Sequence, residues 1–392
     1  MKIRYLLLIL PLLSGCYNYK ELNTLGITTS ISIDYGDDNF NVIAEVVNPL
    51  KQQDASNANK SSFVIFSSSS PSLQEAFREV VLESPRQLYA SQLEIIVLSE
   101  EVVNNHLDEV LEYFSRDPET RTEINIMIAR GSDSTEGITI QTLLSEFSSS
   151  NILESLEVQG KVLGVTYEVT LNELLNMYLD PYLEVSLPSM MLYGDSEVGD
   201  EKENLTTTKP RARVKIGTTS VIKNNKILGY LDMEESKIVN IINGKTKETI
   251  LRYPYKDGYM VFEPNRIKVS YDVDIKNNIV KINIDGFSKI KEIQANTNAK
   301  SKDEIDKINK YFNKMLEEEV TNTFNNIKNE YNTDIFGFRE LYYRTNNKYF
   351  KEHCNDWYDS VFPNIKVEVT SNIKLYEKGN TLGGVKYERR DK

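Results

Sequence analysis

The amino terminus constrains this chain most, because it separates a leader from the part that can fold. Lys2 and Arg4 precede a run of apolar residues at 5–13. A helix that spans a bilayer needs about 20 apolar residues, whereas the hydrophobic region of an export signal is much shorter. The pattern therefore predicts that residues 1–15 are a signal peptide, and that the mature protein begins after them.

The end of this leader carries residues that resemble the bacterial lipobox. Leu13 is aliphatic, Ser14 and Gly15 are small, and Cys16 follows them. Small residues let the backbone enter a peptidase cleft, and a thiol readily forms a thioether with diacylglycerol. The pattern predicts that Cys16 carries S-diacylglycerol and N-palmitoyl groups, which attach the protein to membrane lipid. The alternative is an ordinary signal peptide with an incidental cysteine.

The rest of the chain is acidic. The sequence has 46 basic and 58 acidic residues, and loss of Lys2 and Arg4 would change the net charge from −12 to −14. Phosphate recognition needs clustered Lys and Arg, so we expect no nucleic-acid partner. An anionic lipid surface would repel such a body, so its attachment to a membrane must be hydrophobic. No later stretch has the length of apolar sequence that a spanning helix needs.

Length and cysteine content set the scale of the fold. At roughly 150 residues per domain, a chain of 392 residues suggests two or three domains. Hydrophobic residues make up 40% of the chain, which is enough for a sizeable core. Lipidation of Cys16 would leave Cys354, the only other cysteine, without a partner in the chain. Core packing must therefore hold the fold together.

The first part of the body alternates between strand and helix patterns. Alternating apolar residues predict strands at 27–34, 40–47, 63–66, 93–98 and 124–128. Apolar stripes predict a helix opened by Ser70 and Pro71 and a second helix at 102–114. Residues 138–183 indicate further helices, one of them opened by a capping box of Thr170 and Glu173.

The second part is rich in hairpins. Hairpins of alternating strands are predicted at 220–231, 249–263 and 266–284, and their turns are predicted at Asn224-Asn225, Asp257-Gly258 and Asn277-Asn278. Ser301 and Glu304 form a second capping box, and an apolar stripe follows it along the longest helix. We interpret this stripe as core-facing, with a partner-binding helix as the alternative. A closing strand at 365–375 ends the pattern.

These patterns divide the chain into segments. Residues 16–25 form a lipid-proximal tether, and residues 26–193 form an N-terminal α+β region of one or two subdomains. The charged, polar segment 194–211 is the expected linker. Residues 212–378 form a C-terminal α+β domain, and residues 379–392 form a polar tail. The fold class is therefore α+β, with mixed sheets flanked by helices and a hairpin-rich second half.

Residues that could carry chemistry are few. No G-x-S-x-G, P-loop or H-E-x-x-H motif occurs, and His106 on a predicted helix is best explained by surface solvation. His353 and Cys354 are neighbours, but catalytic dyads usually join positions distant in sequence. Consecutive glutamates at 317–319 point in different directions on a helix and indicate a solvated face. We therefore expect no catalytic residues, no metal and no cofactor.

Several segments resemble the Ger(x)C family of spore germination proteins. Cys16 is followed by an aromatic residue, Tyr17, where Trp is common, and then by Glu21, Leu22 and a strand. An Arg-Asp-Pro segment leads into a strand within residues 115–131. The hairpin-then-helix segment at 219–236 and the carboxy-terminal pattern add matches at the following positions: Gly229, Leu231, Glu235, Asp334, Gly337, Trp357, Phe362 and Gly379.

The resemblance implies a role and a place. It implies the C subunit of a nutrient germinant receptor, acting beside the membrane A and B subunits on the outer face of the spore inner membrane. It also implies a three-domain α+β arrangement and no enzymatic activity. Gly229, Leu231, Glu235, Asp334, Gly337 and Trp357 are then expected to be structural.

Two other functions fit parts of the sequence. A nutrient solute-binding lipoprotein of a transporter would usually show repeated strand-helix-strand units throughout, which the hairpin-rich second half disfavours. An envelope or cortex hydrolase remains compatible with paired carboxylates, which leave no recognisable motif.

Overall fold

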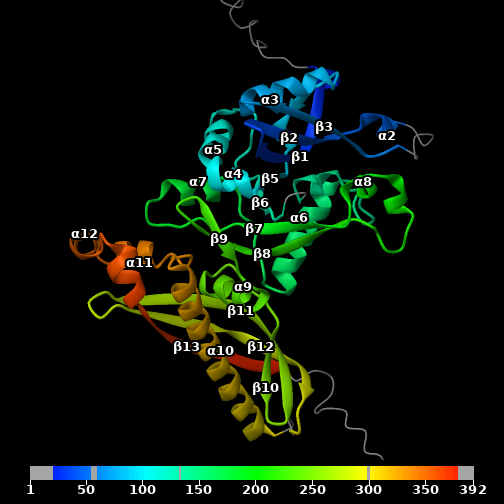
Figure 1. The fold of residues 1–392 in the computed structure, drawn as a ribbon. Coiled ribbons are helices and arrows are strands. Elements are labelled where there is room, and N and C mark those ends of the chain that lie inside the picture. Colours follow the sequence, from blue (N-terminus) through cyan, green and yellow to red (C-terminus); the bar gives the residue numbers. More distant parts are fainter. Residues whose placement is uncertain (1–20, 54–59, 132–133, 298–300, 378–392) are drawn as a thin grey trace, which may run out of the picture.

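A computed structural model describes residues 21–53, 60–131, 134–297 and 301–377 (Figure 1). The predicted signal peptide, the lipobox, Cys16 and the polar tail lie outside these ranges. The described chain has an α+β fold in which the strands form two sheets, of nine and four strands. This confirms the predicted fold class. Among the described residues, no helix combines the length and apolar character needed to cross a membrane.

The first sheet is mixed, with strand order β3-β2-β1-β5-β6-β7-β8-β9 and β4 paired to β1. Its strands are β1 (Leu25–Gly36), β2 (Asn39–Val47), β3 (Phe63–Ser70), β4 (Gln87–Tyr89), β5 (Ile95–Ser99), β6 (Asn125–Ala129), β7 (Pro188–Tyr193), β8 (Arg213–Lys223) and β9 (Lys226–Tyr230). The strands β4, β1, β5, β6 and β7 are parallel, and the remaining pairs are antiparallel.

Helices cover both faces of this sheet, which explains the continuous apolar run in β5. Ile96 and Leu98 face a core shared with α3 (Leu73–Glu79), α4 (Glu100–Asn105), α5 (Leu107–Arg116) and α7 (Leu171–Leu179). Ile95 and Val97 face the opposite core, which is covered by α6 (Ser148–Val162). A parallel strand buried on both faces needs apolar residues at every position.

Local signals place several of these elements well. The capping box of Thr170 and Glu173 is present at the start of α7. The predicted helix at 102–114 is wrong in one respect, because it breaks at His106 into α4 and α5. The start of α3 was also misplaced: its N-cap is Ser72, not Ser70.

The segment 194–211 joins two neighbouring strands of one sheet. β7 and β8 flank it and pair antiparallel, from Met190↔Ile216 to Tyr193↔Arg213. The segment contains α8 (Ser196–Gly199) and a 3₁₀ helix (Lys202–Leu205). It is therefore not a spacer between the two sheets, since the first sheet continues to β9. The predicted domain boundaries themselves stay a prediction.

The second sheet has strand order β10-β11-β12-β13. Its strands are β10 (Leu251–Tyr255), β11 (Gly258–Asp274), β12 (Ile279–Gln294) and β13 (Lys366–Glu377), the last parallel to β12. The predicted turn after β10 is shifted by one residue, because Tyr255 pairs with Gly258 around Lys256 and Asp257. A Cβ at Gly258 would lie 1.6 Å from the carbonyl oxygen of Gln294, so this glycine serves close backbone approach.

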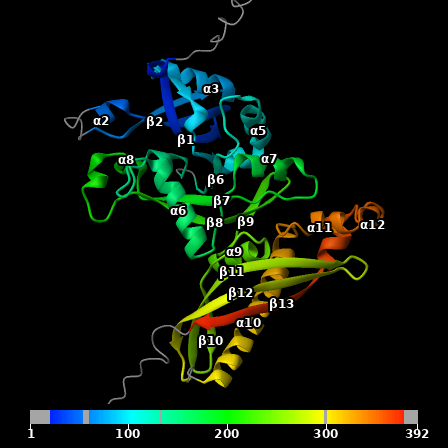
Figure 2. The same cartoon turned by 180° about the vertical axis from the view of Figure 1, so that it is seen from behind.

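One long helix, α10 (Lys302–Tyr331), packs on this sheet (Figures 1 and 2). Its predicted stripe is confirmed as core-facing, with these apolar residues buried: Ile308, Phe312, Leu316, Val320, Phe324 and Ile327. Ser301 caps the helix by accepting from the backbone N–H of Glu304. The Glu304 carboxylate accepts from Lys256 Nζ at 2.7 Å and from Thr297 Oγ1 at 2.6 Å.

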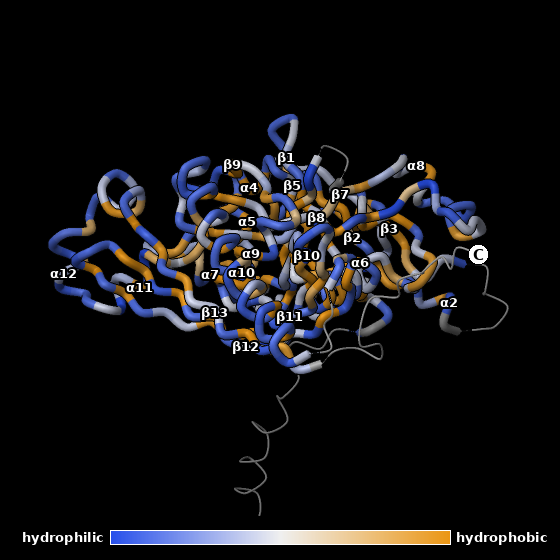
Figure 3. The backbone as a smooth tube through the Cα atoms, turned by 90° about the horizontal axis from the view of Figure 1, so that it is seen from below, coloured by the Kyte–Doolittle hydropathy of each residue, from blue (hydrophilic) through white to orange (hydrophobic). Residues whose placement is uncertain are grey.

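Short elements complete the fold. The remaining α helices are α2 (Pro49–Gln53), α9 (Met233–Ile242), α11 (Phe338–Thr345) and α12 (Asn347–His353). The remaining 3₁₀ helices are Leu22–Thr24, Val80–Leu82, Ala90–Gln92, Ser134–Thr139 and Phe362–Asn364, and a π-helical turn covers Trp357–Val361. Figure 3 shows hydrophobic stretches along the central strands and hydrophilic ones along outer loops and α12.

Candidate functional site

The hairpin β8–β9 lies between the core of the second sheet and one of the two cores of the first. Val221 belongs to the core of the second sheet, and the next residue, Ile222, belongs to a core of the first. Asn224 and Asn225 both have positive φ, as a two-residue type I′ turn requires, which confirms the predicted hairpin. We call the region where this hairpin and α9 meet residues 331–338 the junction.

Gly229 brings β9 close to the end of α10. A Cβ at this position would lie 3.1 Å from both Cε1 and the hydroxyl oxygen of Tyr331. Leu231, two residues further on, is 2% exposed and belongs to the second core. Gly229 allows the close approach and Leu231 packs in the core, so together they hold the hairpin against the second half of the chain.

Glu235 helps to start the helix that follows. Asp232 Oδ1 accepts from the Glu235 backbone N–H at 2.7 Å, and Glu235 Oε2 accepts from the Asp232 N–H at 3.3 Å. This reciprocal capping box satisfies two N–H groups that the first turn of α9 leaves free. Burial raises the pKa of Glu235. Seven residues of the ten-residue helix α9 are buried, so it is a core element of the junction.

Asp334 organises the turn into α11. Its carboxylate is buried and accepts from the backbone N–H groups of Phe336 at 3.3 Å, Phe338 at 3.1 Å and Arg339 at 2.6 Å. Burial raises its pKa to about 6, although these three donors act in the opposite direction. Gly337 has φ +72°, the left-handed region that favours glycine.

Trp357 lies inside the second core. It is 1% exposed and packs edge-on against Tyr342, with the ring centroids 5.1 Å apart. Phe362 also packs against it, at 6.1 Å. The structure therefore places the six predicted motif residues of the described chain in the junction and the adjoining core, and their contacts there are packing, capping and backbone positioning.

A pocket of about 480 Å³ opens beside the junction. Asp334 and Gly337 line it together with charged side chains from other elements. Lys245 Nζ lies 3.1 Å from Glu173 Oε1, and Arg344 pairs with Glu340 on its own helix. The charges that line this junction pocket are thus largely paired with one another.

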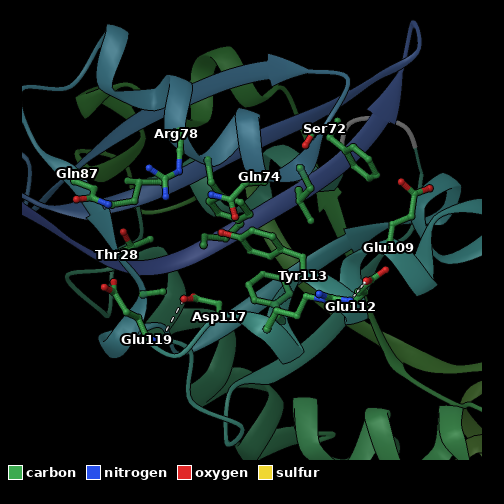
Figure 4. A pocket seen from close by; sticks show the side chains of 18 of the residues that line it. Thr28, Ser72, Gln74, Arg78, Gln87, Glu109, Glu112, Tyr113, Asp117 and Glu119 are labelled. Carbon is green, nitrogen blue, oxygen red and sulfur yellow. Dashed lines mark hydrogen bonds and ion pairs between the residues drawn. The ribbon is translucent and has the colours of Figure 1, made fainter.

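A larger pocket of about 1080 Å³ lies in the first region, between α3 and α5 (Figure 4). Phe77 and Tyr113 stack in it, with ring centroids 4.8 Å apart. Arg116 and Asp117, from the Arg-Asp-Pro segment, contribute to its lining. Arg116 pairs with Glu112 at 2.7 Å. This N-terminal pocket offers stacked aromatic rings and charges of both signs.

Glu45 is a buried carboxylate that sequence reasoning missed. It accepts from Thr29 Oγ1 at 2.5 Å and from the backbone N–H of Ser148 at 2.7 Å and of Ser149 at 3.4 Å. Burial raises its pKa. It satisfies the first N–H groups of α6 and so joins β2 to that helix. The available signal was one acidic residue within the apolar strand pattern at 40–47.

His106 differs from the expected solvated side chain. Its ring stacks on Tyr35, with centroids 3.7 Å apart, and Nδ1 lies 2.8 Å from Glu109 Oε1. The side chain is 17% exposed, so it is mostly covered. The helix breaks at this residue, and its ring packs on the β1–β2 hairpin against Tyr35 and Phe40.

The other residues considered for catalysis or metal binding are His353, Cys354 and the glutamates at 317–319, and their side chains do not converge on a common site. The Cys354 thiol is 2% exposed, and burial raises its pKa, while His353 stacks on Tyr349 and directs Nδ1 toward the carbonyl oxygen of that residue. The side chains of the three consecutive glutamates point to different partners. Glu317 accepts a hydrogen bond from the Ser371 backbone N–H, Glu318 forms an ion pair with Lys314, and Glu319 accepts from the Tyr253 hydroxyl. Within the described ranges, no three His, Cys, Asp or Glu side chains gather as metal ligands.

Comparisons with known proteins cover most of the chain. Residues 18–192 match the family model described as the spore germination protein N-terminal domain, and residues 217–379 match that of the spore germination B3/GerAC-like C-terminal region. Spore germination protein KC of Bacillus subtilis (strain 168) is 22% identical, over 98% of this chain and 97% of its own. Spore germination protein B3 of the same organism is 22% identical, over 97% and 98%.

A solved structure has the same architecture. The crystal structure of the GerBC protein aligns with a TM-score of 0.51 and 18% identity, covering 88% of this chain and 97% of that one. At this identity the similarity concerns the fold, and it agrees with the predicted α+β class. The predicted resemblance to spore germination proteins is confirmed by both family models.

Proposed function

Because the chain belongs to the family of spore germination proteins with GerAC-like regions, we propose that it is the lipid-anchored C subunit of a nutrient germinant receptor. In this role it acts without catalysis, through contacts with the membrane A and B subunits, on the outer face of the spore inner membrane. The observation that carries the proposal is the match of both family regions, in order, along nearly the whole chain.

The anchor is supported by the amino-terminal sequence. Leu13, Ser14, Gly15 and Cys16 fit the lipobox, and the first described residue, Glu21, follows Cys16 by five positions. A single acyl chain binds a membrane only reversibly, whereas two or more give stable attachment. Confinement to a surface raises the effective concentration of a protein for integral partners without any new contact.

The non-catalytic role is supported by how the motif residues are used. Asp334 directs its carboxylate to three backbone N–H groups, and Glu235 completes a helix cap. Trp357 fills the core. Side chains engaged in this way stabilise a helix start, a turn and a core. They fit a protein that presents a fixed surface to partners better than one that turns over a substrate.

Isolation from native membranes tests the proposal. Affinity-tagged protein is extracted from the spore inner membrane in mild detergent, and its co-purifying proteins are identified. We expect two integral membrane proteins to accompany the wild-type chain and to be depleted with Cys16→Ala, which cannot be acylated. Recovery of membrane-bound, acylated chain without any integral partner would contradict the receptor role.

A nutrient-binding lipoprotein is the second candidate, and the N-terminal pocket is the observation that favours it. The pocket is large enough for a small molecule, and its lining combines Phe77, Tyr113 and charges of both signs. Calorimetry of the unacylated chain with single amino acids separates the two roles. Saturable binding in the micromolar range, lost in Tyr113→Ala, would favour nutrient capture, whereas the receptor role as proposed needs no such binding.

A further inference from the structure

We propose that Val81 and Leu82 insert into the outer layer of the bilayer and fix the orientation of the body. Both lie at the end of the molecule where the tether joins the described chain. The inference rests on the proposed lipid anchor and names the surface that faces the lipid. We call residues 80–86 the lipid loop.

The side chains of this loop divide sharply between core and solvent. Val80 is fully buried, whereas Val81 is 51% exposed and Leu82 is 82% exposed. A single exposed apolar residue is common on protein surfaces. Here two consecutive large apolar residues project from one short 3₁₀ helix (Val80–Leu82), beyond the last turn of α3.

The loop lies beside the start of the described chain. β4 pairs in parallel with the first residues of β1, from Leu25↔Gln87 to Ile27↔Tyr89. Arg86 Nη1 donates to the carbonyl oxygen of Leu25 at 3.4 Å. The residues that follow Leu82 therefore run directly to the strand through which the chain leaves its tether. Both ribbon views place α3 and the start of β1 at the same end, opposite the second sheet (Figures 1 and 2).

The length of the tether limits how far this end can be from lipid. Glu21 follows Cys16 by five positions, and a fully extended chain spans at most about 3.6 Å per residue, or about 18 Å in total. An acylated Cys16 therefore keeps Glu21 within that distance of the bilayer surface, and β1 begins four residues further on, at Leu25. Exposed apolar side chains at this end, rather than elsewhere on the body, are the ones that can reach the acyl region.

The neighbouring charges indicate which lipid property matters. Glu79 and Glu83 lie on either side of the apolar pair, and Arg78 and Arg86 add as many positive charges, so the local charge is balanced and anionic lipid has no net charge to attract. Insertion must be driven by burial of apolar surface at the interface. Two side chains contribute little beside the acyl chains, so their effect is on orientation, with the second sheet directed away from the membrane.

A fluorescence experiment on the acylated chain tests the inference. Cys16 is blocked by its lipid and Cys354 is buried, so a single introduced cysteine carries the dye. The labelled variants are Leu82→Cys and, as a matched control, Leu179→Cys, since Leu179 is 74% exposed at the end of α7. Each is reconstituted into phosphatidylcholine vesicles with and without lipids that carry a quencher on the acyl chain. We expect loss of emission at 82 and unchanged emission at 179.

A second variant excludes insertion by the dye itself. The dye is placed at Glu83→Cys, once with Val81 and Leu82 intact and once with both replaced by serine. We expect quenching in the first chain and its loss in the second, with both chains floating with vesicles. Floating chains that are quenched equally, or a label at 82 that is as unquenched as at 179, would overturn the lipid loop alone. A wild-type chain that does not float would contradict the anchor and the loop together.

Discussion

A methyl group at Gly229 would lie 3.1 Å from the ring of Tyr331, so β9 and the end of α10 lie closer together than a side chain at this position would easily allow. This contact joins an edge strand of the first sheet to the helix that covers the second. The adjoining Leu231 is buried in the second core. The β8–β9 hairpin thus contacts both halves of the protein, and a substitution at Gly229 is expected to affect both.

Substitution of Gly229 is expected to destabilise the junction. Gly229→Val places two methyl groups against Tyr331, and overpacking of this kind typically costs about 1–3 kcal/mol. Gly229→Ala requires a shift of a few tenths of an ångström and should cost less. Urea unfolding of the unacylated chain measures both. Gly36→Ala is the control, since its nearest neighbour would be Asn41 Nδ2 at 3.8 Å. Equal unfolding midpoints for Gly229→Val and this control would contradict the packing account.

Asp334 should make stability depend on pH. Burial raises its pKa from 3.8 to about 6 in the folded protein. The group favours the fold while it is protonated, and this contribution is lost as pH rises from about 4 to about 6, because the unfolded carboxyl ionises first. The difference between the two pKa values corresponds to roughly 3 kcal/mol.

The comparison with Asp334→Asn isolates this effect, since the amide does not titrate. The free energy of unfolding of the wild type, relative to the variant, should fall as the pH rises through this window and remain constant above it. Urea unfolding at a series of pH values provides the measurement. A difference that is independent of pH would mean that Asp334 keeps an ordinary pKa in the fold.

Removal of the Glu45 carboxylate should loosen the contact between β2 and α6. Glu45→Ala leaves the Ser148 N–H and the Thr29 hydroxyl buried without this acceptor, which costs about 2–4 kcal/mol. Glu45→Gln keeps one acceptor oxygen and should retain part of the stability. The control is Glu79→Ala, at an exposed position on α3. If Glu45→Ala unfolds at the same temperature as Glu79→Ala, Glu45 does not link β2 to α6 in the way described.

Cys354 should be unreactive until the protein unfolds. The thiol is 2% exposed, and burial raises its pKa, so both access and thiolate formation are suppressed. In a Cys16→Ala background it is the single thiol of the chain. A chromogenic disulfide reagent should react slowly in buffer and stoichiometrically in denaturant. Rapid labelling of the folded protein would reopen the hypothesis of a His353–Cys354 dyad.

Local sequence signals were sufficient for some of the structures that near neighbours close. The asparagine pair at 224–225 predicts its hairpin because both positions need positive φ. Thr170 predicts the start of α7 because its partner Glu173 is three residues away. The same reasoning misplaced the turn after β10, since Gly258 is required by Gln294 on another strand and not by the turn.

Long-range pairing accounts for what the sequence did not reveal. The 194–211 segment looks like a linker in composition, yet it closes an antiparallel pair between β7 and β8. Glu45 meets the start of α6 across 103 residues, and no local pattern records such a partner. For the candidate site, resemblance supplied Gly229, Asp334 and Trp357, and the structure supplied the contacts that bring them to one junction.

Mass spectrometry of the mature amino terminus from spore membranes tests the central claim most directly. The proposed anchor predicts a first residue at Cys16 that carries diacylglycerol and an N-linked fatty acid. A mature chain that begins elsewhere, or that begins at an unmodified Cys16, would contradict the lipid anchor and, with it, the proposed position beside integral receptor subunits.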